Sequence, residues 1–211
     1  METRNSLQLK EVRKSFRRKE ILHGISCDLE NGVYGLLGTN GAGKTTLMRC
    51  MTGYYQYKGD IILNESNVRK MGLRKIGYLP QKFVGYPELS VYQMLEYFCN
   101  IKKLSRREWK DQIDQSLTYT NLEDKRDAKI RTLSGGMVRR VGIAQAILGD
   151  PQVILLDEPT TALDPASVDR LTKTIESLQI AKLIVSHDFA FLKRVCGRMV
   201  TIRDAQILAL E

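Results

Sequence analysis

Hydrophobic and polar residues alternate in two different ways along this chain. In the N-terminal part, single apolar residues alternate with polar ones, which is the pattern of strands with one buried face. This pattern places Leu7 and Leu9 on one predicted strand and Ile25, Cys27 and Leu29 on another. Uninterrupted apolar runs, which are typical of strands buried on both faces, predict strands in residues 33–38, 152–159 and 181–187, and residues 59–65 and 75–81 are two further expected strands.

Between these strands the period changes to that of a helix. Ser90 and Gln93 have the spacing of a capping box, and apolar residues at helical spacing follow them. From there to about residue 122 the chain is polar, charged and poor in β-branched runs, so it is expected to be mostly helical. Asp164 before Pro165 resembles an N-cap with proline in the first turn. Together these features predict helices from about 44 to 53, across 90–122, over 134–148 and from 165 onward.

The composition excludes several classes of protein. The 211 residues are 43% hydrophobic and 27% charged, which is ordinary globular usage. No apolar run approaches the roughly 18 residues that a membrane-spanning helix needs, and residues 1–10 lack the apolar stretch of a secretory signal. We therefore expect a protein that is cytosolic or that sits on a membrane without crossing it. The scattered cysteines predict reduced thiols in place of a metal site or disulfide framework: Cys27, Cys50, Cys99 and Cys196.

The formal net charge of +9 leaves two interpretations open. A solvated basic surface is the general one. Acidic lipid, nucleic acid and nucleotide phosphates are the specific partners that such a charge would attract.

The stretch "GTNGAGKT", residues 38–45, follows a predicted buried strand and opens a predicted helix. It matches the pattern G-x-x-x-x-G-K-[ST] of a phosphate-binding loop. Its glycines let the backbone N–H groups point inward at phosphate oxygens, Lys44 reaches the terminal phosphates, and the Thr45 hydroxyl is a ligand for Mg²⁺. The predicted nucleotide-binding residues are Gly38, Asn40, Gly41, Ala42, Gly43, Lys44, Thr45 and Thr46.

A second chemical feature is the pair of acids that ends the apolar run "VILLDEP". Alternation along a strand points neighbouring side chains in different directions. We expect Asp157 to hold Mg²⁺ and Glu158 to orient or deprotonate the water that attacks the γ-phosphate. Taken alone, the pair could equally be strand-end carboxylates that cap the next loop.

The stretch "LSGGM", residues 133–137, is a serine and two glycines at the predicted start of a helix, which is a second anion site. With the phosphate loop and the acidic pair it resembles the signature of the ATP-binding subunits of ABC transporters, and the resemblance covers essentially the whole chain. In that family two ATPase domains pack head to tail and enclose ATP between the phosphate loop of one and the signature of the other. The resemblance implies that Ser134, Gly135 and Gly136 bind the γ-phosphate held by a second copy or a related subunit.

The fold that the motifs and the resemblance imply is α/β. A single ATPase domain is expected over residues 1–211, with a P-loop NTPase core, a parallel sheet and an N-terminal antiparallel β subdomain. Residues 1–81 and 149–211 are assigned to the β-rich core. An inserted α-helical subdomain that carries the signature is assigned to residues 82–148.

Four other positions gain roles from the resemblance, each with an ordinary alternative. Phe16 is implied to stack on adenine, or is a core aromatic residue. Gln81 is implied to contact Mg²⁺ or the attacking water, or is an exposed loop residue. Asp164 lies in a loop that crosses the dimer interface in the family, or caps a helix. His187 is implied to hydrogen-bond the γ-phosphate, or is a structural residue with its own hydrogen-bond partners, and His23, which has no such context, is expected to be structural only.

Two positions depart from the usual family pattern. Met137 stands where glutamine is most usual, although methionine occurs there in bacterial exporter types. Thr39 replaces a common proline and contributes only backbone. Neither departure is expected to impair hydrolysis, and Met137 together with "YPELSVYQMLEYF" makes the chain look more like exporter than importer ATPases.

The resemblance implies an Mg²⁺-dependent ATPase whose ATP-bound dimer is separated by hydrolysis. A separate membrane-spanning permease is the expected partner, which would hold the chain at the cytoplasmic face of the membrane. The segment Gln81–Phe98 is expected to contact that partner, with Phe83, Tyr86 and Pro87 at the surface, while the ordinary alternative, a hydrophobic core under the helical insertion, accounts for several of its other residues. Transport is expected to be export.

Two other classes of protein remain as alternatives. An ABC-type ATPase that acts on nucleic acid or ribosomes shares the signature and suits a basic surface, although this chain shows neither a heptad run nor a second ATPase domain. Nucleic acid is therefore not the expected partner. A small P-loop kinase would need an acceptor pocket and a lid, and it would not account for residues 133–137.

Overall fold

The computed structural model describes residues 6–17, 19–29, 32–71, 73–178, 180–203 and 206–210. The sequence argument about a secretory signal rests partly on residues 1–5, which lie outside this part. The chain divides into two compact units, residues 1–72 with 181–211 and residues 73–180. Residues 82–148, which the sequence assigns to a helical subdomain, lie within the second unit.

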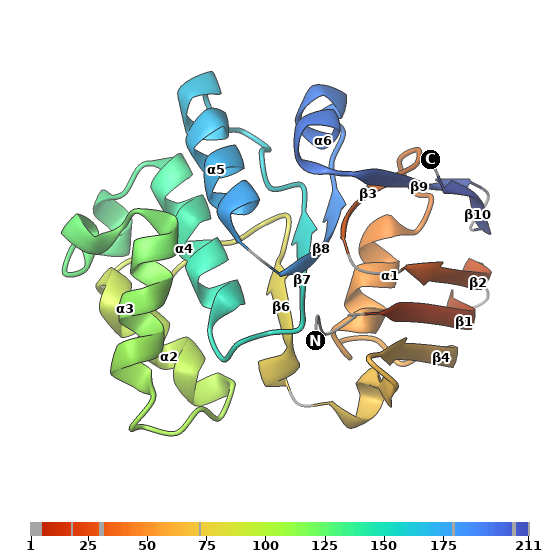
Figure 1. Cartoon of the computed structure of the whole chain (residues 1–211), viewed down its shortest axis with the longest axis horizontal. Helices are drawn as coiled ribbons and strands as arrows, with labels where there is room; N and C mark the ends of the chain where they lie inside the picture. The colour runs from red at the N-terminus through yellow and green to blue at the C-terminus, as the bar shows by residue number, and fades with distance from the viewer. Residues whose placement is uncertain are drawn as a thin grey trace. The chain divides into compact units, whose positions relative to one another are not determined.

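The first unit begins with an antiparallel sheet (Figure 1). Its strand order is β2 (Lys19–Leu29), β1 (Leu7–Phe16), β4 (Lys58–Leu63) and β5 (Ser66–Asn67). The alternation predicted for its first strand is confirmed, because Leu7 and Leu9 are both buried while their neighbours along β1 are more exposed. Leu7 pairs with Leu29 on one side and with Leu63 on the other, so the apolar face continues across three strands.

The rest of the first unit is built on parallel strands. β3 (Val33–Leu37) lies between β8 (Ala181–Val185) and β9 (Arg198–Arg203) and runs parallel to both, and β10 (Gln206–Leu210) pairs antiparallel with β9. The α-helices in the described part of this unit are α1 (Lys44–Met51) and α6 (Phe189–Val195). A side chain at Gly35 would lie 3.3 Å from Cys196 Sγ and 3.4 Å from Leu192 Cδ2, so α6 and the residue after it pack closely on β3.

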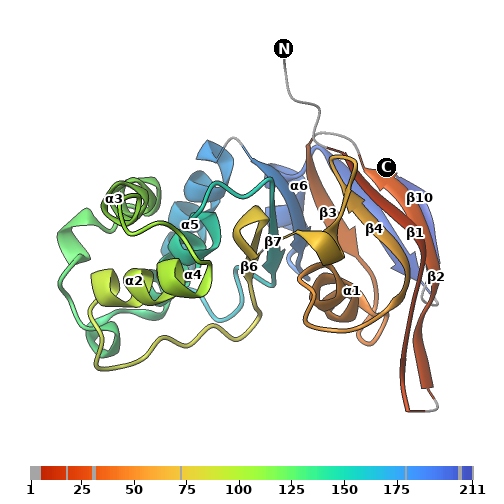
Figure 2. The same cartoon turned by 90° about the horizontal axis from the view of Figure 1, so that it is seen from below.

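The second unit combines a short parallel strand pair with a group of helices (Figure 2). β6 (Ile76–Leu79) runs parallel to β7 (Val153–Asp157). The helices are α2 (Val91–Ile101), α3 (Trp109–Thr120), α4 (Gly135–Ile147) and α5 (Pro165–Ser177). Short 3₁₀ turns occupy Val68–Lys70 in the first unit and Leu73–Lys75, Glu123–Lys125 and Ile130–Thr132 in the second.

Local capping rules set the starts of α2 and α5 as predicted. Ser90 Oγ accepts a hydrogen bond from Gln93 N at 3.2 Å, and Gln93 Oε1 accepts one from Ser90 N at 2.9 Å, which is a complete capping box for α2. Asp164 caps α5 and Pro165 opens it. The expected α/β class, with parallel strands, an N-terminal antiparallel sheet and a helical region, is therefore confirmed.

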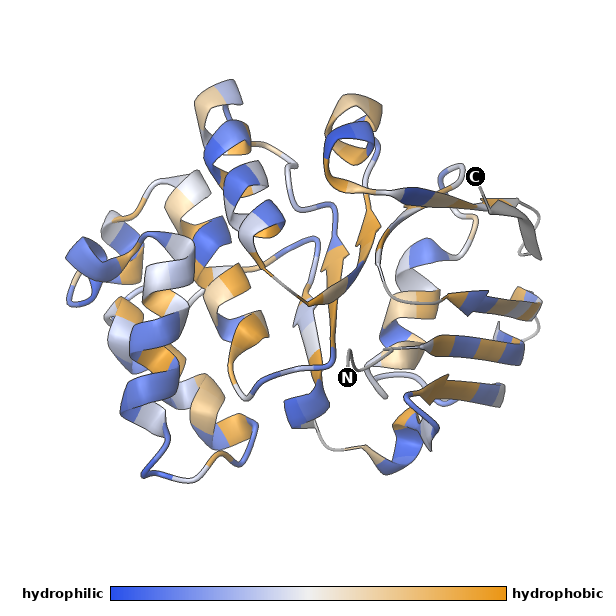
Figure 3. Cartoon of the chain, viewed as in Figure 1, coloured by the Kyte–Doolittle hydropathy of each residue, from blue (hydrophilic) through white to orange (hydrophobic). Residues whose placement is uncertain are grey.

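Three helices of the second unit share one apolar cluster, and one of them, α4, is buried along all of its length after Val138. The cluster takes residues from α2, α3 and α4, among them Leu95, Ile113 and Val141, all three fully buried. Figure 3 shows the helices banded by hydropathy, while β7 is hydrophobic along most of its length. No helix in the described ranges is long and apolar enough to cross a membrane.

One expected surface residue packs against this cluster. Phe83 is half-buried and packs against the cluster, so it is less exposed than a surface position predicts. The reason is Gly142 on α4, where an added Cβ would lie 3.0 Å from the Phe83 ring; the missing side chain leaves room for the ring. Tyr86 and Pro87 are exposed as expected.

A buried cation binds the carbonyl groups at the end of one helix in this unit. Lys102 Nζ donates hydrogen bonds to Ala146 O at 3.0 Å and Leu148 O at 2.7 Å, at the end of α4. The last carbonyls of a helix have no partner within the helix, so a buried helix end needs such donors. Burial lowers the pKa of Lys102 from 10.5 to about 8, an effect only partly opposed by Cys99.

The depressed pKa of Lys102 makes the stability of the fold depend on pH. Between about pH 8 and pH 10.5 an unfolded chain still holds the proton that the folded chain has released, so raising the pH favours folding in this window. Relative to Lys102→Met, the wild-type free energy of unfolding in urea should rise across the window by on the order of 3 kcal/mol. Lys110→Met, at an exposed position of α3, is the matched control. A difference between wild type and Lys102→Met that stays flat or falls would contradict this account.

Candidate functional site

The phosphate loop, defined here as residues 38–45, joins β3 to α1 in the first unit. β3 ends at Leu37 and α1 begins at Lys44, as the predicted strand-loop-helix order requires. Gly43 caps α1 with φ +98, a left-handed value that glycine adopts without strain, and an added Cβ there would lie 2.7 Å from Leu22 Cδ2. Gly41 also has a positive φ of +83, yet its added Cβ would meet no described atom within 4 Å. The loop is therefore closely packed at Gly43, whereas the space next to Gly41 is open.

Lys44 folds back over this loop. Its side chain is buried, and Nζ donates to Gly38 O at 2.6 Å and to Thr39 O at 3.0 Å. The first turn of α1 contains no acidic residue, and no side chain caps its N–H groups. Backbone N–H groups, the positive end of the helix and an ammonium group thus lie together, which suits the binding of an anion.

Two predicted residues of the first unit lie at exposed ends of strands. Phe16, the last residue of β1, is 38% exposed, so the alternative that it is a core aromatic residue is wrong. Its ring meets Tyr55 edge-on at 4.9 Å between centroids, and Lys14 Nζ lies 4.8 Å from its centre. His187 is exposed in the turn between β8 and α6, one residue before Asp188, which caps α6.

The acidic pair lies in the second unit, at the end of β7. Asp157 is the last residue of the strand and is 1% exposed, and Glu158 is 6% exposed. Glu158 has φ +51, a left-handed value that is unfavourable for a residue with a side chain. Strand alternation therefore does not set the direction of the Glu158 side chain, as the sequence argument assumed; the left-handed turn sets it. Such backbone conformations concentrate at functional sites.

The signature, residues 133–137, forms the start of α4. Ser134 caps the helix and its Oγ accepts a hydrogen bond from Met137 N at 3.3 Å. Ser134 and Gly135 are exposed, and the first turn of α4 has no acidic residue. An added Cβ at Gly135 would meet no described atom within 4 Å, whereas one at Gly136 would lie 2.6 Å from Ser167 Oγ. The helix start is again open on one side and packed on the other.

Asp164 and Gln81 complete the predicted set in this unit. Asp164 Oδ1 accepts from Ser167 N at 3.0 Å, so it does cap α5, and hydrogen bonding from Ser167 lowers the pKa of its carboxyl. The Gln81 side chain is exposed, and its carbonyl accepts a hydrogen bond from Arg139 Nη1 at 3.0 Å.

Arg139 and Ser167 are structural neighbours of the site that sequence reasoning missed. Arg139 follows the signature in a basic stretch, which reads as a solvated surface, yet the residue is buried. Ser167 looks like an ordinary residue in the first turn of α5. Only the close approach of Gly136 to it shows its importance.

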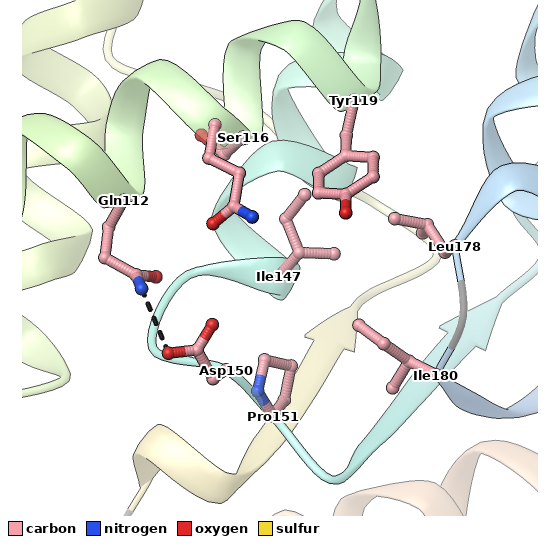
Figure 4. A pocket seen from close by; sticks show the side chains of 9 residues that line it. Gln112, Ser116, Tyr119, Ile147, Asp150, Pro151, Leu178 and Ile180 are labelled. Atoms are coloured by element: carbon pink, nitrogen blue, oxygen red, sulfur yellow. Dashed lines mark hydrogen bonds between the residues drawn. The ribbon is translucent and has the colours of Figure 1, made fainter.

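A separate cavity of about 210 Å³ opens in the second unit (Figure 4). It contains none of the predicted site residues. Gln112 on α3 points into it and donates to Asp150 Oδ2 at 3.0 Å. Over the described ranges, no three or more His, Cys, Asp or Glu side chains come together as a metal site would require.

Comparison with known proteins agrees with this set of motifs. The sequence model of the family described as "ABC transporter" matches residues 22–161, more than half of the chain. The lipopolysaccharide export system ATP-binding protein LptB of Escherichia coli (strain K12) is 33% identical over 97% of this chain and 89% of its own length. The methionine import ATP-binding protein MetN of Clostridioides difficile (strain 630) is 30% identical over 96% of this chain and 67% of its own length.

The fold is similar to that of solved structures with the same type of description. CbiO1 from Clostridium perfringens, described as part of the ABC transporter complex cbiONQ, superimposes with a TM-score of 0.84 at 27% identity. The match covers 97% of this chain and 87% of that one. With the phosphate loop, the acidic pair and the signature helix all present, the chain belongs to the ABC transporter family as an ATP-binding subunit, an ATPase coupled to transport.

Proposed function

We propose that this chain is an Mg²⁺-dependent ATPase subunit that closes with a second copy, or with a related subunit, around shared ATP and thereby drives export. One observation carries this proposal. The chain has two helix starts, at α1 and α4, that lack acidic residues in the first turn and have open space above a glycine, Gly41 or Gly135. The phosphates of a single nucleotide fit between two such starts, one from each subunit.

The residues fit ATP in both halves of such a site. In the phosphate-loop half, the N–H groups of residues 38–46 and the ammonium of Lys44 would hold the phosphates, which would take over from Gly38 O and Thr39 O as its partners. Asn40, Ala42 and Thr46 would contribute there through the loop and the first turn. In the signature half, Ser134, Gly135 and Gly136 would contact the γ-phosphate of the other subunit's nucleotide. The exposed face of Phe16 would take the adenine ring.

The donor set also suits Mg²⁺. Thr45, Gln81 and Asp157 offer hydroxyl, amide and carboxylate oxygens, and Mg²⁺ prefers such hard ligands, supplemented by phosphate oxygens and water. The ion would neutralise charge on the phosphates when bound. The buried position of Asp157 would hold its carboxylate in one place for this purpose.

Hydrolysis depends on Glu158 in this proposal. Its carboxylate would orient or deprotonate the attacking water, with Gln81 as a second contact to that water and His187 as a hydrogen-bond partner of the γ-phosphate. Asp164 would place the α5 start at the interface between the subunits. ATP favours the closed dimer because both half-sites touch it only there, and its loss reverses this preference.

The partner would be a membrane-spanning permease subunit, with this chain on the cytoplasmic face of the membrane. The exposed apolar residues of the second unit support a docking surface for it: Val84 is 81% and Tyr86 52% exposed, and Pro87 is exposed beside them. The direction is proposed as export from the resemblance of Met137 and the segment 86–98 to exporter types. Residues 1–211 would act as one ATPase domain, with residues 82–148 as the signature-bearing subdomain.

Nucleic acid is a weaker candidate partner for this chain. Five cationic side chains of the described part are buried, against two acidic ones, so part of the net charge of +9 lies inside the protein. The surface is therefore less basic than the composition suggests. Binding to nucleic acid that weakens steeply with added salt would favour that alternative.

Glu158→Gln tests the proposed catalytic role. The amide keeps the shape of the side chain but removes the base, so steady-state phosphate release should fall by about 100-fold or more. ATP should then hold the variant as a dimer in size-exclusion chromatography with light scattering. Glu158→Gln combined with Lys44→Met, which removes the phosphate-binding ammonium, should remain monomeric. A Glu158→Gln variant that stays monomeric at saturating ATP, or that retains turnover, would count against the proposal.

Variants of the two adjacent glycines of the signature test two different roles, a structural one and a ligand-binding one. Gly136→Ala should destabilise the fold by about 1–3 kcal/mol, because its Cβ meets Ser167, and adding Ser167→Gly should restore most of this stability. Gly135→Ala should change stability by less than about 0.5 kcal/mol but lower ATPase activity at least tenfold, because its Cβ occupies the space proposed for the γ-phosphate. Urea unfolding and phosphate release measure the two effects. Full activity in Gly135→Ala would argue against a phosphate at this helix start.

A further inference from the structure

Arg139 occupies an unusual position for an arginine. It lies on α4, five residues after the cap Ser134, and it is 7% exposed. A buried guanidinium must find partners for its N–H groups, because each unsatisfied donor is costly away from water. The question is which groups of the second unit supply those partners.

All five N–H groups of Arg139 are used, and every acceptor is a backbone carbonyl. Nη1 donates to Pro80 O at 2.8 Å and to Gln81 O at 3.0 Å. Nη2 donates to Asp157 O at 2.8 Å and to Glu158 O at 2.6 Å, and Nε donates to Pro159 O at 2.9 Å. A guanidinium has five N–H donors in a rigid fork, so one side chain fills its whole capacity here.

These acceptors are not scattered. They form two short segments, residues 80–81 and residues 157–159, and each contains a residue with a proposed role in hydrolysis, Gln81 and Glu158. The segments are 18 to 59 residues away from Arg139 in sequence, so no local rule of helix or strand brings them together. The same side chain fixes the backbone at both.

The charge of Arg139 strengthens these bonds. Burial lowers the pKa of the guanidinium to about 10, and Asp157 and Glu158 act in the opposite direction. The group is therefore charged at neutral pH. Hydrogen bonds from a charged donor are roughly twice as strong as neutral ones, which helps to hold Glu158 in its left-handed conformation.

We propose that Arg139 is a positioning residue that ties the signature helix to the hydrolytic residues of the same chain. Contact of Ser134 and Gly135 with ATP would restrict the motion of the first turns of α4. Through its hydrogen bonds, Arg139 would extend this restriction to the backbone at Gln81 and Glu158. This inference rests on the proposed function of those two residues. The inference goes beyond that function in one respect: the helix α4, which would contact the neighbouring subunit's nucleotide, also keeps the hydrolytic groups of its own subunit in position.

Arg139→Lys is the main test. Lysine keeps the positive charge but has three donors on one nitrogen, so it cannot span five carbonyls in two segments. Because misplacement of catalytic groups by about 1 Å can cost 100-fold in rate, kcat should fall by about 10- to 100-fold. The KM for ATP and the affinity for a fluorescent ATP analogue should change less than about threefold.

Arg140→Lys is the matched control. Arg140 is the next residue of α4 and is similarly buried, but its Nη1 donates to Thr120 O at 2.9 Å and Asn121 O at 2.7 Å, at the end of α3. The Arg140→Lys variant should have a lower melting temperature than wild type, but its kcat should fall by no more than about threefold. An equal loss of kcat in both variants, or a kcat in Arg139→Lys within threefold of wild type, would overturn the inference.

Amide hydrogen exchange in a chain that keeps Arg139 provides a test that does not depend on the folding of Arg139→Lys. In Glu158→Gln, ATP should slow amide hydrogen exchange at the start of α4 and, together with it, in residues 80–83 and 157–161. Adding Arg139→Gln to this variant removes the buried charge. ATP should then still slow exchange at the start of α4 but no longer slow it together with residues 80–83 and 157–161. Protection confined to the start of α4 in Glu158→Gln itself would sink the inference, whereas turnover by Glu158→Gln would sink the proposed function instead.

Discussion

Both units depend on one constraint: backbone carbonyl groups inside the protein need hydrogen-bond donors. Loops and helix ends expose carbonyls that no regular secondary structure can satisfy. This chain meets the need with buried cations: Lys44 serves the phosphate loop, Lys102 the end of α4, Arg140 the end of α3 and Arg139 two segments at once. Each places a positive charge where the apolar surroundings strengthen its hydrogen bonds. The irregular backbone of the site is thereby held without regular secondary structure.

This arrangement separates the groups that hold the backbone of the proposed site from the N–H groups that would face its ligand. The cationic side chains bind carbonyl groups, while the first turns of α1 and α4 have no acidic residue and an added Cβ at Gly41 or Gly135 would meet no described atom within 4 Å. Side-chain caps would otherwise compete for such N–H groups. At α4 the Ser134 cap takes only Met137 N, the amide furthest along the first turn. A site of this kind costs little reorganisation when an anion arrives, because its donors are already oriented.

Sequence reasoning succeeded for local features that a recognisable residue pattern marks. Capping at Ser90 and Asp164, the strand-loop-helix order at residues 33–51 and the alternation in β1 all depend on residues within a few positions of one another. It failed where distant segments meet. Phe83 turned inward because Gly142, far along the chain, leaves room for it, and the acceptors of Arg139 lie up to 59 residues away. The left-handed turn at Glu158 was equally hidden, since no glycine marks it.

The departure at Met137 can be judged by where its side chain lies. Residues in the first turn of α4 divide between two faces: Ser134 and Gly135 are exposed, while Met137 is partly buried and packs against the apolar cluster of the helices. A flexible thioether fills an irregular apolar gap well, whereas a glutamine there would need polar partners. The backbone N–H of Met137 still binds Ser134 Oγ, so the helix start keeps its shape whatever this side chain is. Variation at this position therefore adjusts how α4 packs on its own unit, and the open face above Gly135 is left unchanged.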